Sequence, residues 1–319
     1  MGVTPGADEN GDPAITLDED VVLHKCYRNP LEVLVCAHAL GFGIYGKKIV
    51  QMLENEEHWK DFGYKVVSGK LSEGETVEIL RPKDNSPSSI SNNNDIDVIV
   101  SMSVCKSADD EIEQAASKIV SDIKIEGLQP EDILVISADD RYAKPYLSKV
   151  ATLLNENEIA TNNLHSDAYG LQDFFNEGCV TLSTIHKAKG NEAYSVYILG
   201  IDALFQRPNI RYRNMIFTAM TRTKGWLHIS GVGDFAAAFK AELDIAKKNC
   251  PSIVFKYPSE LELKIMQRDL TENVELRVDR ALDELQDELR PEEFKKILRE
   301  RLRNTRVTYK KKPKGKEFK

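Results

Sequence analysis

The chain has 319 residues, of which 41% are hydrophobic and 29% charged, a balance typical of a soluble globular protein. Its five cysteines form no CxxC pair and its six histidines show no ligand spacing, so neither a metal site nor a disulfide framework is expected. No apolar run approaches the ~18 residues of a membrane-spanning helix, and the N-terminus does not have the pattern of a signal peptide, so we expect a cytoplasmic location.

The charge of the chain is unevenly distributed. The net charge of −8 argues against a uniformly basic nucleic-acid binder. Residues 295–319 nevertheless hold twelve Lys or Arg and two Glu, a net charge of +10, so the remaining chain carries −18. A basic tail, here residues 304–319, can engage phosphate backbones, and it can equally be a solvated end. Both interpretations stay open.

The chain begins with a polar segment, residues 1–19, which we interpret as a leader loop. A short strand is predicted next, followed by the polar turn KCYRNP, which holds Tyr27 and Arg28. An aromatic face suits a nucleotide base, and a guanidinium suits phosphate oxygens. Taken alone, these two neighbours carry little information.

The segment GFGIYGKK, residues 41–48, contains two nucleotide-binding fingerprints, GxxxxGK and GxGxxG. Lys48 stands where a phosphate-binding loop has the Ser or Thr that binds Mg²⁺. We therefore predict a structural role, in which a helix over 31–40 ends at Gly41 and another helix covers 47–54. A self-contained nucleotide-binding enzyme that uses this segment stays the alternative.

Apolar periodicity and turn residues predict alternating strands and helices in the rest of the chain. Glycine-bounded alternation over 62–82 predicts a β-hairpin, and the Ser/Asn-rich residues 84–95 predict a loop. Asp139 and Asp140 are interpreted as initiating the helix after them. The remaining predictions are strands over 95–104, 132–139 and 252–258, the last closing the sheet, and helices over 109–124, 142–159, 235–248 and 260–303. This rhythm implies an α/β fold with a parallel sheet flanked by helices.

Polar side chains accompany the apolar strands of residues 179–230. Strands are predicted over 180–185, 194–201 and 225–229, with a short helix that carries Thr221 and Arg222. Because ligands of α/β sheets bind outside the carboxyl ends of the strands, we expect polyanion contacts at those ends.

Three segments resemble the motifs of one family. TIHKAKGNEA, residues 184–193, resembles motif V of the UvrD/Rep-type superfamily 1 DNA helicases. TAMTRTK, residues 218–224, resembles motif VI, and the turn with Tyr27 and Arg28 resembles motif IV. The resemblance implies that residues 20–258 form the second RecA-like, P-loop-type motor domain, with a small insertion over 60–96. Residues 259–303 would then be a helical extension.

The resemblance also implies roles for single residues. Arg222 would be the arginine finger, a guanidinium that stabilises the charge on the transferred γ-phosphate of ATP. The nucleotide would be contacted further by Tyr27 on the adenine, by Arg28 on the γ-phosphate and by Gly190 and Glu192 near the ribose. Single-stranded or partly duplex DNA would lie on Thr184, His186 and Lys187. Asn191, Ala193 and Thr223 replace the family's commoner Leu, Phe and Ala.

The sequence offers no credible loop for the ATP phosphates and no carboxylate for Mg²⁺. In the family both lie in the first RecA-like domain, which would have to be supplied in cis or in trans. The chain alone is therefore expected to be inactive as an ATP-dependent helicase, with ATP and Mg²⁺ bound mainly by the first domain. A non-catalytic nucleic-acid-binding module is a further alternative.

Overall fold

The computed structural model describes residues 24–53, 55–165, 173–206 and 209–266. The chain divides into two compact units, Met1–Glu260 and Leu261–Lys319, and each is described by itself. Of the predicted helical extension, residues 260–266 are described, and they are helical. Three other predictions lie outside the described residues: the leader, the basic tail and, up to residue 23, the strand before Tyr27.

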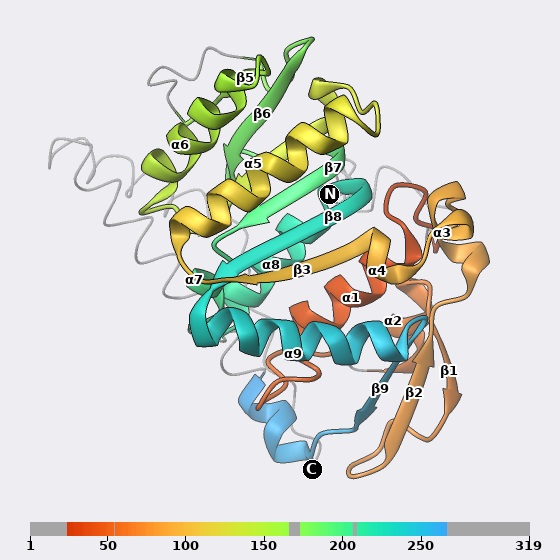
Figure 1. The fold of residues 1–319 in the computed structure, drawn as a ribbon. Coiled ribbons are helices and arrows are strands. Elements are labelled where there is room, and N and C mark those ends of the chain that lie inside the picture. Colours follow the sequence, from red (N-terminus) through yellow and green to blue (C-terminus); the bar gives the residue numbers. More distant parts are fainter. Residues whose placement is uncertain (1–23, 54, 166–172, 207–208, 267–319) are drawn as a thin grey trace, which may run out of the picture. The chain divides into compact units, whose positions relative to one another are not determined.

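The first unit is built on a six-stranded, all-parallel sheet (Figure 1). In spatial order its strands are β3 (Val100–Cys105), β8 (Thr223–Val232), β7 (Ala193–Leu199), β4 (Ile133–Ser137), β6 (Cys179–Thr184) and β5 (Ala160–Asn163). The central strand β4 is buried at every position because neighbouring strands and helices cover both of its faces. The predicted α/β class with a parallel sheet flanked by helices is confirmed.

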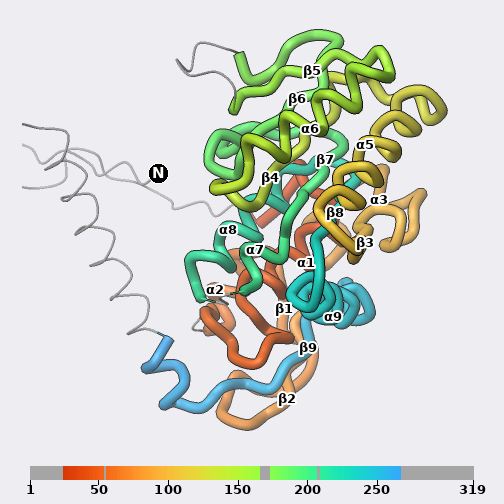
Figure 2. Tube along the Cα trace, turned by 60° about the vertical axis from the view of Figure 1, so that its left-hand side comes forward, coloured from red at the N-terminus to blue at the C-terminus, as the bar shows by residue number. Residues whose placement is uncertain are grey.

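Helices cover the sheet on two sides. Helices α5 (Ala108–Lys124) and α6 (Ala143–Glu156) share one apolar core with β4, β6 and β7. Helix α1 (Leu31–Phe42) packs against both α8 (Ile210–Met220) and α9 (Gly233–Asn249) (Figure 2). Connections between parallel strands are right-handed, so the direction in which a connection runs along the sheet decides which face its helix covers. The connection from β7 through α8 to β8 runs in the opposite direction to the connection from β3 through α5 to β4. Helices α5 and α8 therefore lie on opposite faces.

A second, smaller sheet is antiparallel. Its strands, in order, are β1 (Lys65–Ser68), β2 (Thr76–Leu80) and β9 (Ser252–Lys256). The predicted hairpin over 62–82 is confirmed, but the prediction that 252–258 closes the main sheet is wrong. Period-two alternation identifies a strand and not its partner. Here Phe255 packs near the buried Trp59 of α2 (Glu56–Asp61), which holds β9 beside the hairpin.

Other differences from the predicted elements are local. Helix α1 extends to Phe42, and residues 43–53 form turns and coil instead of the second helix predicted from residue 47. The predicted strand over 95–104 begins with a helical turn, α4 (Ile96–Ile99), because Asp95 accepts backbone hydrogen bonds from Val98 and Ile99. The predicted loop 84–95 contains the short helix α3 (Ser89–Asn93). Strand β5 is absent from the predictions.

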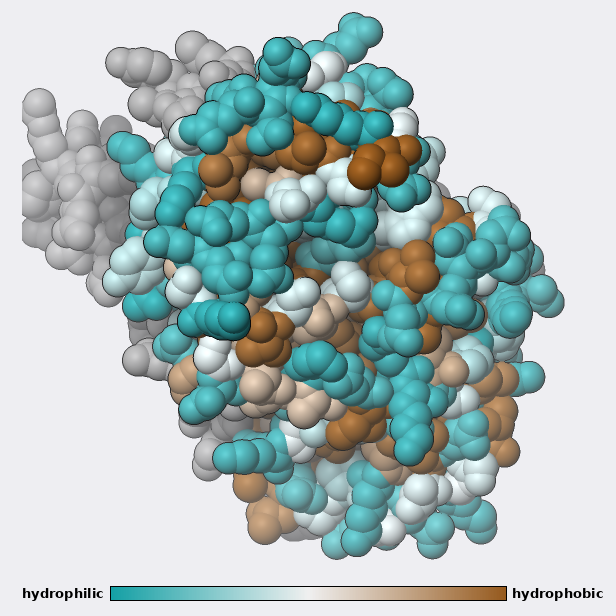
Figure 3. All heavy atoms as spheres, viewed as in Figure 1, coloured by the Kyte–Doolittle hydropathy of each residue, from teal (hydrophilic) through white to brown (hydrophobic). Residues whose placement is uncertain are grey.

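The surface on the side of α5 and α9 is mostly polar. Figure 3 shows apolar side chains there in separate patches among polar ones. Exposed apolar residues include Val98, Val104, Ile125 and Ile245. Single exposed apolar residues are ordinary for a folded protein. None of the helices among the described residues is long and apolar enough to cross a membrane.

Candidate functional site

Arg222 lies in the connection between helix α8 and strand β8, not on a helix as predicted. The helix ends at Met220, with Thr221 at its C-cap, and β8 begins at Thr223. The Ala193 N–H donates to the Arg222 carbonyl at 3.0 Å, and Ala193 pairs with Thr223. Arg222 therefore lies at the amino ends of β7 and β8, so the prediction that the polar groups gather at the carboxyl ends is wrong for this residue.

The Arg222 guanidinium is held by backbone oxygens. Its Nε donates to the Thr218 carbonyl at 2.9 Å, and Nη1 donates to the Asn191 carbonyl at 3.3 Å. Nη2 lies 3.4 Å from the Thr221 hydroxyl. These bonds engage three of the five N–H groups of an arginine, so two remain for a ligand. The side chain is half-buried and fixed in place, and no carboxylate among the described residues bonds to it directly.

Further charged residues lie around Arg222. The Glu192 carboxylate is 3.5 Å from Arg28 Nε and 3.8 Å from Lys224 Nζ. The Lys224 ammonium also lies 4.6 Å from the centre of the Tyr194 ring. Burial lowers the pKa of Arg222, the charge of Arg28 lowers it further, and Glu192 opposes the change. Three cations therefore surround one carboxylate, and the excess positive charge favours a polyanion.

Tyr27 and Gly190 complete the predicted nucleotide contacts. The Tyr27 side chain is 74% exposed, so its ring face is open to a ligand. Gly190 has a φ of 91°, and a Cβ there would meet no atom within 4 Å. Its backbone conformation, and not a lack of room, is what favours glycine at this position.

The three predicted DNA-contacting residues lie at the other edge of the sheet. Thr184 ends β6 opposite Ser137 of β4, at the carboxyl edge, and its side chain is almost fully buried. The exposed His186 has its Nε2 3.2 Å from the Asp140 carboxylate. The Lys187 ammonium donates to the Leu164 carbonyl at 2.6 Å. Only His186 and Lys187 of the three therefore present side chains to solvent.

Residues 185–192 connect the two edges. This segment leaves β6 at the carboxyl edge and enters β7 at the amino edge. The two edges are roughly 15 Å apart, which is the length of the five residues of β4 between them. Backbone hydrogen bonds from Ala188 to Thr184 and from Asn191 to Ala188 hold it in turns. The single motif TIHKAKGNEA thus supplies residues to two sites, which we call the amino-edge cluster (Arg28, Glu192, Arg222 and Lys224) and the carboxyl-edge cluster (Asp140, His186 and Lys187).

The segment that carries both clusters is recognised by comparison with known families. Residues 180–230 match the UvrD-like helicase C-terminal domain. The resemblance seen in the sequence motifs is confirmed. Among solved structures, the C-terminal domain of a possible DNA helicase from Lactobacillus plantarum WCFS1 is similar, with 13% identity and a TM-score of 0.35. That similarity covers 46% of this chain and 83% of the other. No curated protein matches the chain.

The region that matches the UvrD-like helicase C-terminal domain runs from β6 into β8, so it includes Arg222 and excludes Tyr27 and Arg28. The fold brings Arg28 to Glu192 nonetheless, because α1 follows the turn that holds Arg28 and packs against α8. Sequence reasoning missed Lys224 and Asn29 at this cluster. Lys224 stands inside TAMTRTK, directly after the predicted site residues, which was the available signal.

Sequence reasoning also missed part of the carboxyl edge of the six-stranded sheet. Asp139 accepts bonds from the backbone and side chain of Arg141, and Tyr142, not Asp140, occupies the N-cap position of α6. A cavity of about 500 Å³ opens there, at the ends of β4, β7 and β8. Its lining includes Ser137, Asp139, Arg141 and Tyr142. The two aspartates therefore belong to this edge rather than capping the following helix.

GFGIYGKK does not have the geometry of a phosphate-binding loop. A helix, α1, precedes it where such a loop follows a strand, and residues 43–53 contain no helix after it. Gly43, with a φ of 71°, caps α1 as its N–H donates to the Leu40 carbonyl at 3.1 Å. The predicted structural role is supported, although the helix ends two residues later than predicted.

Gly46 is expected to be required for packing and not for nucleotide binding. A Cβ at this position would lie 2.8 Å from Arg213 Nη2 and 2.9 Å from Glu242 Oε1. Gly46→Ala should therefore lower the free energy of unfolding in urea by about 1–3 kcal/mol. Lys47→Ala, next to it, should change neither stability nor ATP hydrolysis by the complete motor. Loss of ATP hydrolysis in Lys47→Ala would restore the nucleotide-loop alternative.

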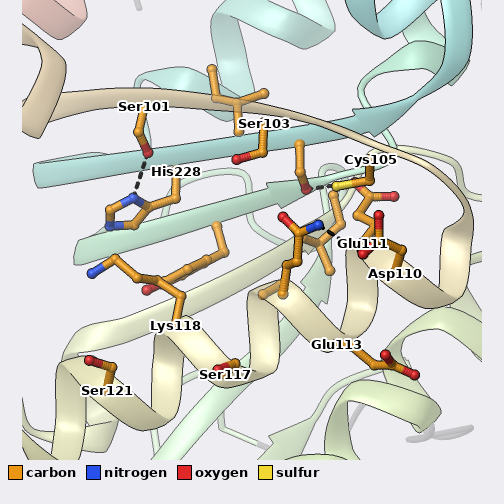
Figure 4. A pocket seen from close by; sticks show the side chains of 16 residues that line it. Ser101, Ser103, Cys105, Asp110, Glu111, Glu113, Ser117, Lys118, Ser121 and His228 are labelled. Carbon is orange, nitrogen blue, oxygen red and sulfur yellow. Dashed lines mark hydrogen bonds between the residues drawn. The ribbon is translucent and has the colours of Figure 1, made fainter.

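A polar groove of about 640 Å³ lies between α5 and strands β3, β7 and β8 (Figure 4). It exists because α5 connects β3 to β4 and packs over the centre of the sheet, leaving β3 and β8 partly uncovered on that face. His228 lines the groove, with Nδ1 2.8 Å from the Ser101 hydroxyl. Burial lowers the pKa of His228 from 6.5 to about 4, and the nearby Asp122 opposes this change.

The low pKa of His228 predicts loss of stability in acid. Between pH 6.5 and 4 the unfolded histidine binds a proton and the folded one does not, so stability falls as the pH falls through this range. The loss approaches about 3 kcal/mol below pH 4. Urea unfolding between pH 7 and 5 should show a smaller pH dependence for His228→Gln than for the wild type. Equal dependence in His228→Gln and wild type would contradict this prediction.

Proposed function

We propose that this chain provides the second motor domain of an ATP-dependent DNA helicase. The observation that carries the proposal is the amino-edge cluster, in which two arginines and a lysine surround one carboxylate within a UvrD-like helicase C-terminal domain. Bringing Arg28 close to the half-buried Arg222 costs free energy, and the single charge of Glu192 offsets this cost only in part because it faces three cations. A triphosphate would supply the remaining negative charge.

ATP would bind at this cluster from the side that the first RecA-like domain covers. Arg222 would place its two remaining N–H groups on the γ-phosphate, where negative charge builds in phosphoryl transfer. Arg28 would contact the same phosphate, Tyr27 would stack on the adenine, and Glu192 and Gly190 would lie near the ribose. The phosphate-binding loop and most ligands of Mg²⁺ would come from the first domain, in cis or in trans. The proposal places this motor in the cytoplasm.

The carboxyl-edge cluster would contact single-stranded DNA. His186 and Lys187 are exposed and basic. His186 contacts Asp140, which directly follows Asp139 of the cavity that also contains Arg141 and the 60% exposed Tyr142. Cations hold the phosphate backbone and aromatic rings stack on bases. Because residues 185–192 join this cluster to Glu192, closure of the motor around ATP would move the DNA contacts as well.

Reconstitution tests the proposal. DNA-stimulated ATP hydrolysis is measured for this chain alone, for the first motor domain alone, and for both together. Activity of the combination that exceeds the sum of the parts supports the second motor domain. Activity of this chain alone would favour a self-contained enzyme. DNA binding by this chain without any gain in ATP hydrolysis would favour a non-catalytic module.

Lys187 is expected to contact DNA phosphates. Lys187→Ala should weaken binding of a single-stranded oligonucleotide, and the slope of log affinity against log salt should fall by ~0.7 because one phosphate contact is lost. Lys149→Ala is the matched control, since Lys149 is a surface lysine paired with Asp109 between α5 and α6. Fluorescence anisotropy at several salt concentrations measures both. An unchanged slope for Lys187→Ala would remove this residue from the DNA site.

A further inference from the structure

Asn29 connects the two arginines of the amino-edge cluster. It directly follows Arg28, and its side chain is buried, with 2% exposed. One amide nitrogen, Nδ2, donates to the Thr221 carbonyl at 3.0 Å and to the Thr223 carbonyl at 2.7 Å. These carbonyls belong to the residues on either side of Arg222. The same side chain therefore holds the backbone before and after Arg222.

The orientation of the Asn29 amide is fixed by its partners. Carbonyl oxygens only accept hydrogen bonds, so the NH₂ group and not the oxygen must face Thr221 and Thr223. Both N–H groups are then used. Oδ1 faces the other way, towards Arg28 Nε at 3.5 Å and Cys26 Sγ at 3.7 Å. Asn29 thus contacts the Arg28 side chain with one end of its amide and the Arg222 backbone with the other.

We propose that Asn29 is a positioning residue that fixes the spacing between Arg28 and Arg222. Two guanidinium groups repel each other, and Arg222 lies in the short connection between α8 and β8, outside both elements. The two hydrogen bonds of Asn29 prevent this connection from moving away from the turn that carries Arg28. We call these two hydrogen bonds the tether. The role of the tether in ATP hydrolysis rests on the proposed function, whereas the existence of the tether does not.

The chemistry at position 29 is specific to an amide. Alanine removes both of the hydrogen bonds that Asn29 donates to the Thr221 and Thr223 carbonyls. Serine is shorter and has one donor, so it retains at most one of the two bonds. We expect the effect on Arg222 to grow in the order wild type, Asn29→Ser, Asn29→Ala. If Asn29→Ala does not fold, the comparison of Asn29→Ser with the wild type still tests the tether.

Asn162 is a matched control within the same chain. It is also buried, and its Nδ2 also donates to two consecutive carbonyls, those of Asp173 at 2.9 Å and Phe174 at 3.0 Å. It lies on β5, at the opposite end of the sheet from β8. Asn162→Ala therefore removes the same kind of bonds without touching Arg222.

The tether is tested in this chain by NMR. The Arg222 Nε–H donates to the Thr218 carbonyl and is expected to exchange slowly with solvent. Asn29→Ala should raise the exchange rate of this N–H by on the order of 10-fold or more, and Asn29→Ser by less, while Asn162→Ala leaves it unchanged. An unchanged Arg222 exchange rate in Asn29→Ala, or equal changes in Asn29→Ala and Asn162→Ala, would overturn the tether.

The catalytic consequence is tested in the complete motor. Asn29→Ala should lower kcat for ATP hydrolysis by on the order of 10²-fold, because a displaced Arg222 no longer matches the transition state. The KM for ATP and the affinity for single-stranded DNA should stay within about twofold. A purely structural role would instead lower the active fraction and be reproduced by Asn162→Ala. Faster Arg222 exchange with unchanged kcat would establish the tether and refute the proposed catalytic role of Arg222.

Discussion

Replacing Arg222 with alanine is expected to reduce kcat for ATP hydrolysis by about 10³–10⁵ in the complete motor. The guanidinium is fixed by backbone oxygens of Thr218 and Asn191, and under the proposed function its two remaining N–H groups would contact the γ-phosphate. Because these contacts strengthen as charge builds in the transition state, the loss falls on kcat. Affinity for single-stranded DNA should stay unchanged, since Arg222 lies at the opposite edge of the sheet from His186 and Lys187.

Two control variants separate this effect from charge and folding. Arg222→Lys keeps the positive charge and loses the planar fork, so we expect it to recover only a small part of the activity. Arg211→Ala removes an exposed arginine from the start of α8 and should leave kcat unchanged. Steady-state kinetics with saturating DNA measure kcat for Arg222→Ala, Arg222→Lys and Arg211→Ala. Near-normal turnover in Arg222→Ala would refute the assignment of the arginine finger.

Replacing Arg213 or Glu242 singly is expected to lower the free energy of unfolding by about 3–5 kcal/mol. Arg213 Nη1 and Nη2 lie 2.7 Å and 3.0 Å from the two carboxylate oxygens of Glu242. Nη1 also donates to the Leu40 carbonyl at 3.0 Å, and both side chains are nearly inaccessible to solvent. Removing either partner leaves a buried charge without compensation, and α1, α8 and α9 lose the contact that joins them.

A double-mutant cycle in urea measures this pair. The double variant Arg213→Met/Glu242→Leu should lose less stability than either single variant, because no unpaired charge remains. Lys240→Ala provides a surface control on the same helix, since its pair with Asp244 is largely exposed and should contribute about 0.5 kcal/mol or less. Single variants at Arg213 and Glu242 that lose less than about 1 kcal/mol would contradict the prediction.

The sequence was sufficient to predict the class of the sheet. Apolar runs such as 133–137 and an amphipathic helix such as α5 are local signals, and both predictions were confirmed. The arrangement of the predicted site was not predictable in the same way. His186 and Glu192 are six positions apart, yet they lie at opposite edges, because residues 185–192 cross the sheet without forming a helix.

The role of Gly46 and the position of β9 both depend on contacts that are distant in the sequence. A glycine indicates that a Cβ is not tolerated but not why; at Gly46 the reason is the buried ion pair of Arg213 on α8 with Glu242 on α9, more than 160 residues away. The alternation of residues 252–258 predicts a strand, but the packing of Phe255 near Trp59 decides which sheet it joins. The amide of Asn29 was overlooked for the same reason, because both carbonyls that it binds are far away in the sequence.

The position of Glu192 has a consequence for the resting state of the domain. Its carboxylate lies between Arg28 and Lys224 and acts as a built-in counter-ion when no nucleotide is present. A singly charged anion such as chloride gains little by replacing it. Under the proposed function, a triphosphate would carry enough charge to displace it, and the released carboxylate would then accept a hydrogen bond from a ribose hydroxyl. The cluster would thereby discriminate between anions by their charge, independently of any contact with the base or the sugar.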